Sequence, residues 1–384
     1  MSTFLTMLDP PLLPWQKPVP YSKGSEPAAY AALGMTPGAP EIWEDGLRTD
    51  PSKFSFEWWY YDAHFADGSS VVVVYYTKPM FMPGAPELPY VQVTIVTADG
   101  QAINKQFAAP PSDVGFSTEG CDLYIGPNHS SGDLEDYVLY AKIDDVEVNL
   151  DMHGLVPSWR PGSGHVFFGK GYDTRFGWLP AIPSGLTTGT MTYAGQTHAV
   201  VGSGYHDHNW GNTRLYDHEK RWWWSRGQVG PYTVIAADQR LKNRYGHDVW
   251  MPTFVVLDQN GARIDASLSN VTMKHTESNF QTHPDPNFAG SPDGKIAKTV
   301  TFRAESTNGD WAEFRIDASL LLLSQDLTPA ISLGMSDLEN YIAQLLHRSP
   351  WYTRFAGAAQ LTFNIGGVQY QGVGGSTLEL MDLE

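Results

Sequence analysis

Cysteine is almost missing from this sequence: Cys121 is the only one among 384 residues. A single cysteine excludes an intramolecular disulfide and a metal cage built from thiolates. Lysine and arginine are also few, 25 against 42 acidic residues, and they form no cluster. The net charge of −17 therefore argues against binding to nucleic acid or to an anionic membrane surface.

Long apolar runs are absent too, and no segment reaches the length that spans a membrane. The residues before Asp9 and Pro10 are too short and uncharged a stretch for a secretory signal peptide. We therefore expect a cytoplasmic protein, or a secreted one if a leader has been removed.

The sequence also lacks the motifs of the common cofactors. No Gly-x-Gly-x-x-Gly opens a helix after a strand and no P-loop is present, which argues against a nucleotide cofactor. No Gly-x-Ser-x-Gly elbow and no His-Glu-x-x-His occur either. His206 and His208 could offer two imidazoles on one face, but no third ligand stands at a recognised spacing. We therefore expect neither a metal nor an organic cofactor.

Glycine and proline are plentiful, at 37 and 27 residues, and 13% of the chain is aromatic. Short apolar or alternating runs recur between turn signals such as Asp67-Gly68 and Asn308-Gly309, which is typical of antiparallel hairpins. The predicted fold is all-β, with two tandem lipocalin-like antiparallel domains, each a barrel or a sandwich. One short helix is expected in the C-terminal domain, after the capping box formed by Ser336 and Glu339.

A chain of 384 residues favours two domains. Residues 1–50 are rich in proline and lack periodicity, and we predict an extended N-terminal arm there. The N-terminal domain is predicted over residues 51–225 and the C-terminal domain over residues 226–384. This boundary is chosen because the three consecutive indoles at 222–224 cannot all face one core.

Residues 202–211 hold the densest cluster of chemically active side chains, Gly-Ser-Gly-Tyr-His-Asp-His-Asn-Trp-Gly. Alternate side chains of a strand share a face. One face then carries Tyr205, Asp207 and Asn209, and the other His206, His208 and Trp210. A carboxylic acid between hydrogen-bonding neighbours in an aromatic pocket can serve as a proton donor. A polar strand end with paired histidines would explain the same residues without catalysis.

A second stretch, residues 56–62, reads Phe-Glu-Trp-Trp-Tyr-Tyr-Asp. Alternation places an acid and aromatic rings on both faces, with Glu57, Trp59 and Tyr61 on one and Trp58, Tyr60 and Asp62 on the other. Carboxylates are almost never buried unless they are paired or protonated. Glu57 is therefore either salt-bridged to an arginine or an acid of the active site.

Together these two stretches carry a resemblance to a known family. Glu57-Trp-Trp-Tyr-Tyr-Asp62 followed by Gly204-Tyr-His-Asp-His-Asn-Trp-Gly211 resembles the carotenoid 1,2-hydratase (hydroxyneurosporene synthase) superfamily of tandem lipocalin-like proteins. Kievitone hydratase and fungal decalin-forming Diels–Alderases are similar to that group. The resemblance implies two β-barrel-like domains and cofactor-free chemistry on an apolar, often isoprenoid-bearing substrate. It also places the family's Tyr-x-Asp element on Tyr205 and Asp207, and its upstream indole on Trp178.

We predict that both stretches line or support one pocket in or beside the N-terminal domain. The predicted catalytic residues are Asp207, Glu57, Tyr205 and His208. The predicted substrate-binding residues are Trp59, Tyr61, Trp178, Asn209, Trp210 and Trp223, the last closing the pocket from the C-terminal side.

Hydration of an isolated alkene needs a proton donor, a stabilised carbocation and a held water, and an acid in an aromatic pocket supplies the first two. The leading hypothesis is a cofactor-independent enzyme of secondary metabolism that hydrates a prenyl double bond of an apolar substrate. A Diels–Alder-type cyclase acting on a polyene or quinone-methide-like substrate would use the same residues. A lipocalin-like carrier of an apolar ligand is the non-enzymatic alternative, and its pocket would be uniformly apolar.

Overall fold

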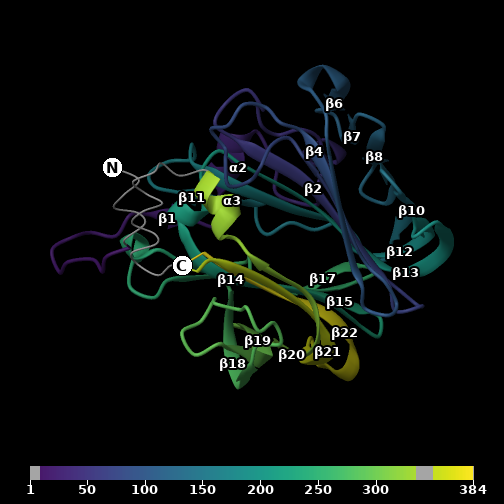
Figure 1. Ribbon diagram of the computed structural model, residues 1–384. Coiled ribbons are helices and arrows are strands. Elements are labelled where there is room, and N and C mark those ends of the chain that lie inside the picture. Colours follow the sequence, from purple (N-terminus) through teal and green to yellow (C-terminus); the bar gives the residue numbers. More distant parts are fainter. Residues whose placement is uncertain (1–8, 334–348, 384) are drawn as a thin grey trace.

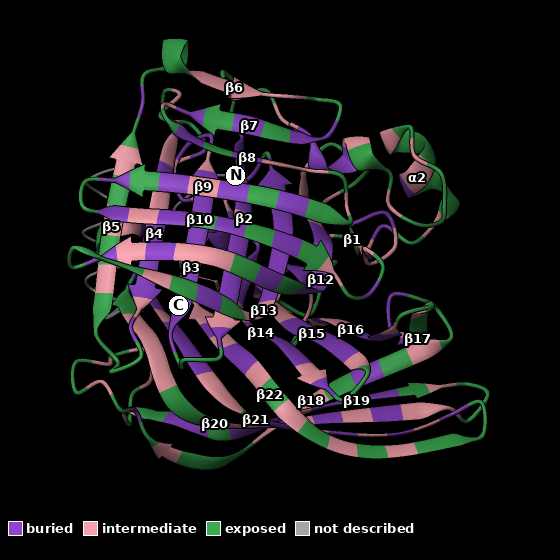
Figure 2. Cartoon of the chain, turned by 90° about the vertical axis from the view of Figure 1, so that its right-hand side faces the viewer, coloured by how far each residue is buried: buried purple, intermediate pink, exposed green. Residues whose placement is uncertain are grey.

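The computed structural model describes residues 9–333 and 349–383. Two antiparallel sheets make up most of this part of the chain, and they lie one above the other in Figure 1. The predicted all-β class with two tandem antiparallel units is therefore confirmed. Buried and exposed residues alternate along strands such as β9 (Asp136–Ile143) and β10 (Val146–Gly154), because one face of the sheet packs on the core (Figure 2).

The first sheet runs in the order β5-β4-β3-β2-β13-β12-β10-β9-β8-β7-β6, with β1 pairing to β11 and β11 to β12. Its other strands are β1 (Tyr21–Ser22), β2 (Phe56–Phe65), β3 (Ser70–Tyr76), β4 (Tyr90–Val96), β5 (Ala102–Ala108), β6 (Val114–Phe116), β7 (Cys121–Ile125), β8 (Asn128–Gly132), β11 (His165–Phe168), β12 (Arg175–Tyr193) and β13 (Gln196–Gly211). The long β12–β13 hairpin turns at Ala194 and Gly195, both with positive φ, which is the geometry of a two-residue hairpin turn.

The second sheet runs in the order β17-β16-β15-β14-β22-β21-β20-β19-β18. Its strands are β14 (Glu219–Val229), β15 (Tyr232–Leu241), β16 (Trp250–Asp258), β17 (Gly261–Asp265), β18 (Val271–Thr282), β19 (Lys295–Ser306), β20 (Trp311–Asp326), β21 (Trp351–Ile365) and β22 (Val368–Asp382). The last two strands join through Gly366 and Gly367, which also have positive φ.

Helices are short in the described residues. They are α2 (Pro27–Leu33), α3 (Thr328–Leu333) and the 3₁₀ turns η1 (Ile42–Asp45), η2 (Pro111–Asp113), η3 (Leu215–Asp217) and η4 (Asn243–Tyr245). The helix predicted after Ser336 lies outside the described residues. Within residues 9–333 and 349–383, no helix has the length and apolar character needed to cross a membrane.

The N-terminal arm is less extended than expected, since it contains α2 and η1. The arm is held against both sheets. Its β1 pairs with β11 of the first sheet, and Asp9 forms an ion pair of 2.6 Å with Lys220 of the second. The N-terminal arm therefore contacts both sheets. The acids of η1 are buried against the core of the first sheet.

The chain passes from the first sheet to the second between Gly211 and Glu219, so residue 225 falls inside β14. A division into separately folding domains near that point stays a prediction. Each sheet has its own apolar core. A further cluster lies between the sheets, where Tyr205 of β13 meets Trp224 of β14 with ring centroids 5.2 Å apart.

Candidate active site between the two sheets

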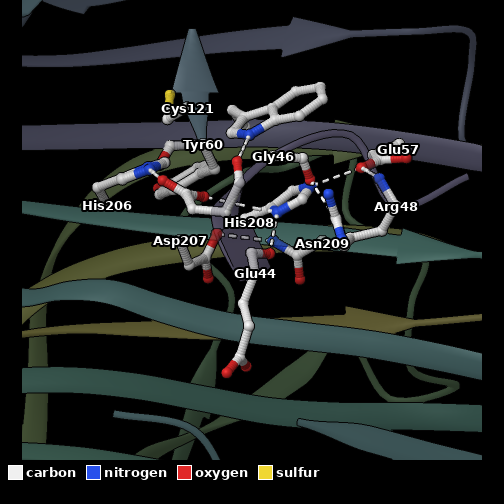
Figure 3. A network of polar contacts seen from close by, with 12 residues as sticks. Glu44, Gly46, Arg48, Glu57, Tyr60, Cys121, His206, Asp207, His208 and Asn209 are labelled. Carbon is white, nitrogen blue, oxygen red and sulfur yellow. Dashed lines mark hydrogen bonds and ion pairs between the residues drawn. The ribbon is translucent and has the colours of Figure 1, made fainter. Parts of the chain in front are cut away.

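The residues of β13 divide between two environments as the alternation predicts. Figure 3 shows Asp207 and Asn209 on one side of the strand, with His206 and His208 on the other. Asp207 and Asn209 line a cavity of about 410 Å³ whose walls come from both sheets. Its aromatic lining includes Trp58, Tyr60, Tyr76, Tyr90, Phe176, Trp178, Trp222, Trp224 and Tyr352. The candidate site thus lies between the sheets and not inside one barrel.

Asp207 is held by three hydrogen-bond donors. Its Oδ2 accepts from the Tyr205 hydroxyl and from the Trp178 indole N–H, both at 2.8 Å. Its Oδ1 accepts from the Asn209 amide at 2.7 Å. Burial raises the pKa of Asp207 to about 6, although these donors and the charge of His206 lower it. The group therefore exchanges its proton close to neutral pH while its orientation is fixed.

Glu57 does not enter this cavity, so the predicted shared pocket is wrong for this residue. Its carboxylate accepts from the backbone N–H groups of Arg48 and Thr49 at 2.6 and 2.7 Å, and from the Thr49 hydroxyl at 2.7 Å. His208 Nε2 lies 2.8 Å away, and Glu57 and His208 are both fully buried. The alternative of a paired structural acid holds, although the side-chain partner is a histidine and not an arginine.

The core face of β13 is a closed network rather than part of the site (Figure 3). His206 contacts the Tyr60 carbonyl at 2.9 Å and Asp45 at 3.2 Å. The His208 ring stacks on Trp59 at a centroid distance of 4.5 Å. Both histidines are buried with acceptors on each ring nitrogen, so neither can act on a substrate in the cavity. The structure therefore places His208 outside the cavity lining, and its predicted catalytic role stays a prediction without support from the geometry.

Four predicted substrate-binding aromatics are also core residues and not cavity residues. They are Trp59, Tyr61, Trp210 and Trp223. The Trp223 indole donates to Glu277 at 2.9 Å inside the core of the second sheet, while its neighbours Trp222 and Trp224 line the cavity. The other two predicted binding residues, Trp178 and Asn209, do line the cavity.

A buried ion cluster beside the cavity was not predicted as part of the site. Asp62 pairs with Arg226 and, at 2.9 Å, with Arg354, which joins the first sheet to the second. Burial would raise the pKa of Asp62, but the two guanidinium groups hold it below its usual value. The alternation along β2 places Asp62 on the same face as Tyr60, and this pattern in the sequence could have indicated that Asp62 lies beside the cavity.

Glu219 is a second acid that the sequence did not single out. It lines the cavity, is 1% exposed, and neither of its carboxyl oxygens has a hydrogen-bond partner. Burial raises its pKa to about 8. The pairing of β14 shifts register between Glu219 and Arg221. The simple alternation of faces along β14 therefore does not predict the direction of the Glu219 side chain. A bulge of this kind leaves no clear trace in the sequence.

Among residues 9–333 and 349–383, one buried group has the composition of a metal site: Asp45, Cys121 and His206 offer ligand atoms within 4.8 Å of one another. However, burial raises the pKa of the Cys121 thiol well above its usual value, which disfavours the thiolate that metals bind. The thiol contacts the Tyr61 hydroxyl at 3.4 Å, and His206 is occupied as described. The arrangement fits a hydrogen-bonded core better than a metal centre.

Comparison with known proteins agrees with the resemblance found in the sequence. No family model matches the chain. It is 26% identical over 205 residues to the quinolone epoxide rearrangement protein penF of Penicillium thymicola, covering 48% of this chain and 55% of that protein. It is 24% identical over 212 residues to hydroxyneurosporene dehydrogenase of Chlorobaculum tepidum, covering 45% and 53%. Each match spans about half the length of the curated relative.

Two solved structures have the same fold. CghA superposes with a TM-score of 0.58 at 12% identity, over 91% of this chain and 95% of its own. Kievitone hydratase of Nectria haematococca gives 0.51 at 14% identity, over 90% and 96%. The predicted resemblance is therefore confirmed: the relatives in sequence include a hydroxyneurosporene dehydrogenase, and this chain shares the fold of CghA and of kievitone hydratase.

Proposed function

We propose that this protein is a cofactor-independent enzyme in which Asp207 protonates an apolar, isoprenoid-bearing substrate bound between the sheets. The observation that carries the proposal is the Asp207 carboxyl group, oriented by Tyr205, Trp178 and Asn209 in an aromatic cavity. Indole and phenol faces around it can stabilise the cation that protonation creates. The product expected first is the hydrated prenyl group, formed when water adds to that cation.

A rearrangement or cyclisation is the second candidate, and the similarity to an epoxide rearrangement protein favours it. The same acid can open an epoxide or polarise a carbonyl, and the cation then collapses within the substrate if water is kept out. The carrier hypothesis is less well supported, because charged groups such as Arg354 and Glu379 also line the cavity.

Mass spectrometry after incubation with prenylated phenols in ¹⁸O-labelled water tests these choices. Hydration adds one labelled oxygen and two hydrogens, whereas rearrangement or cyclisation yields an isomer of unchanged mass. The corresponding epoxides are incubated in parallel. Tight binding of all these compounds without any product would contradict the proposal and favour the carrier.

The rate should depend on pH through Asp207, because a general acid must be protonated to act. Its pKa of about 6 means that the protonated form is lost as pH rises above that value. We expect turnover to decline on the alkaline side and to be weak above about pH 8. Initial rates measured from pH 5 to 9 check this, and a rate that keeps increasing up to pH 9 would contradict an acid role.

Treatment with a chelator should leave turnover unchanged, because the proposed chemistry uses protein carboxyl groups alone. Activity is measured before and after dialysis against EDTA, with metal content determined on the same samples. Loss of activity that returns with one added metal would indicate a metal enzyme instead.

A further inference from the structure

Glu379 of β22 lies in the wall of the cavity opposite the Asp207 strand. In the second sheet it stands between two direct neighbours, Trp224 of β14 and Arg354 of β21. Both neighbours touch the first sheet: the Trp224 ring packs on Tyr205, and Arg354 pairs with Asp62. Glu379 is therefore held across from the pair formed by Tyr205 and Asp207.

Arg354 is shared between Asp62 and Glu379. The Arg354 Nη2 lies 2.9 Å from Asp62, whereas its Nε lies 3.3 Å from Glu379 Oε1, and neither of these last two atoms makes a hydrogen bond. The Glu379 side chain keeps 13% of its surface exposed, more than Asp62 or Arg354. Because Glu379 lines the cavity, its carboxylate can meet a bound molecule there, beside the Tyr352 hydroxyl that hydrogen-bonds to it.

Burial and the charged groups around Glu379 place the pKa of its carboxyl group near neutral pH. Burial raises its pKa to about 7, Arg354 and the Tyr352 hydroxyl lower it, and the charges of Asp62 and Asp207 raise it. From the first sheet Tyr60 also faces this group, with its hydroxyl 3.2 Å from Asp62. Asp207 and Glu379 line one cavity, and the charge of Asp207 raises the proton affinity of Glu379, so the titration of Glu379 depends on that of Asp207.

We propose that Glu379 is a second catalytic residue, which accepts the proton released by water after Asp207 has protonated the substrate. This inference rests on the proposed hydration. The Asp207 O–H bond breaks and a C–H bond forms at the alkene, leaving a carbocation. Water bonds to that cation through its oxygen and loses one proton to the Glu379 carboxylate. Return of this proton to the ionised Asp207 restores the starting state, so one water is added in total.

Glu379→Gln tests the assignment because it keeps the shape and removes the base. Turnover should fall by about 100-fold. The wild-type rate should also fall at acidic pH, where Glu379 is protonated, and the variant should lose this acidic limb. In Glu379→Ala, added formate should restore part of the activity by replacing the missing carboxylate. The matched control is Glu313→Gln, since Glu313 pairs with Arg303 at 3.3 Å on the outside of the same sheet.

An acidic limb that persists in Glu379→Gln would overturn the proposal, as would an inactive Glu379→Ala that formate does not restore. Either result leaves the role of Asp207 intact. A titration of the substrate-free protein by infrared spectroscopy separates the two questions. The carboxyl band absent from Glu379→Gln should titrate at lower pH in Asp207→Asn, because the charge of Asp207 is gone. An identical midpoint in wild type and Asp207→Asn would overturn the pairing, whether or not the substrates tested are turned over.

Discussion

Asp207→Asn should reduce turnover by about 100-fold or more while leaving the melting temperature nearly unchanged. Asparagine has the size of aspartate and can still accept hydrogen bonds from Tyr205 and Trp178 through its amide oxygen. What it lacks is the transferable proton. The loss should therefore appear in kcat far more than in KM, because the cavity walls that bind the substrate are untouched.

The measurement is a comparison of steady-state rates for wild type and Asp207→Asn, with substrate affinity determined separately by fluorescence quenching. Asp122→Asn is a suitable control, because Asp122 is an exposed aspartate of β7 that does not line the cavity. Full activity in Asp207→Asn would remove Asp207 from the mechanism. A variant that no longer binds substrate would instead assign Asp207 a binding role.

Those features of the candidate site that depend on the geometry of a single strand could be predicted from the sequence. Alternation along β13 correctly separates Asp207 and its donors Tyr205 and Asn209 from His206 and His208, because a strand has a period of two. The same rule divides β2 correctly into two faces. It does not tell which face meets the core when both carry aromatic rings and an acid. For this reason Glu57 was placed in the pocket although the other face lines it.

The site residues that the sequence did not predict are brought to the cavity by contacts between distant segments of the chain. Arg354 and Glu379 belong to the last hairpin, and only the packing of the second sheet on the first brings them to the cavity. The three consecutive indoles at 222–224 cannot all face one core. Which of them lies in the core, as Trp223 does, depends on which face of β14 packs against the core of the second sheet. Such choices are set by tertiary packing and not by local pattern.

Glu57 and Asp207, two of the three acids on the paired strands β2 and β13, lie in opposite environments. Asp207 faces a cavity and its neighbours are neutral donors, so its proton can leave and return. Glu57 faces the core, where two backbone N–H groups, a hydroxyl and His208 surround its carboxylate. One acid is therefore expected to control turnover and the other to control stability.

Glu57→Gln should accordingly destabilise the fold by about 1–3 kcal/mol, the usual cost of leaving buried hydrogen-bonding groups unsatisfied. Glutamine is nearly isosteric, but its amide group places a donor where Thr49 or His208 now meets an acceptor. The buried His208 ring would also lose the Glu57 carboxylate that its Nε2 now contacts. The free energy of unfolding is measured by urea denaturation. Glu147→Gln provides the control, because Glu147 pairs with Lys142 at 2.8 Å on the surface, where such pairs contribute little.

Turnover per folded molecule decides whether Glu57 is structural only. Since its carboxylate is closed off from the cavity, the folded fraction of Glu57→Gln should retain most of the wild-type rate at a temperature well below its melting point. A stable variant that has lost activity would mean that Glu57 acts on the chemistry through β13. A variant as stable as wild type would contradict the assignment of Glu57 and His208 as the buried pair that anchors this strand.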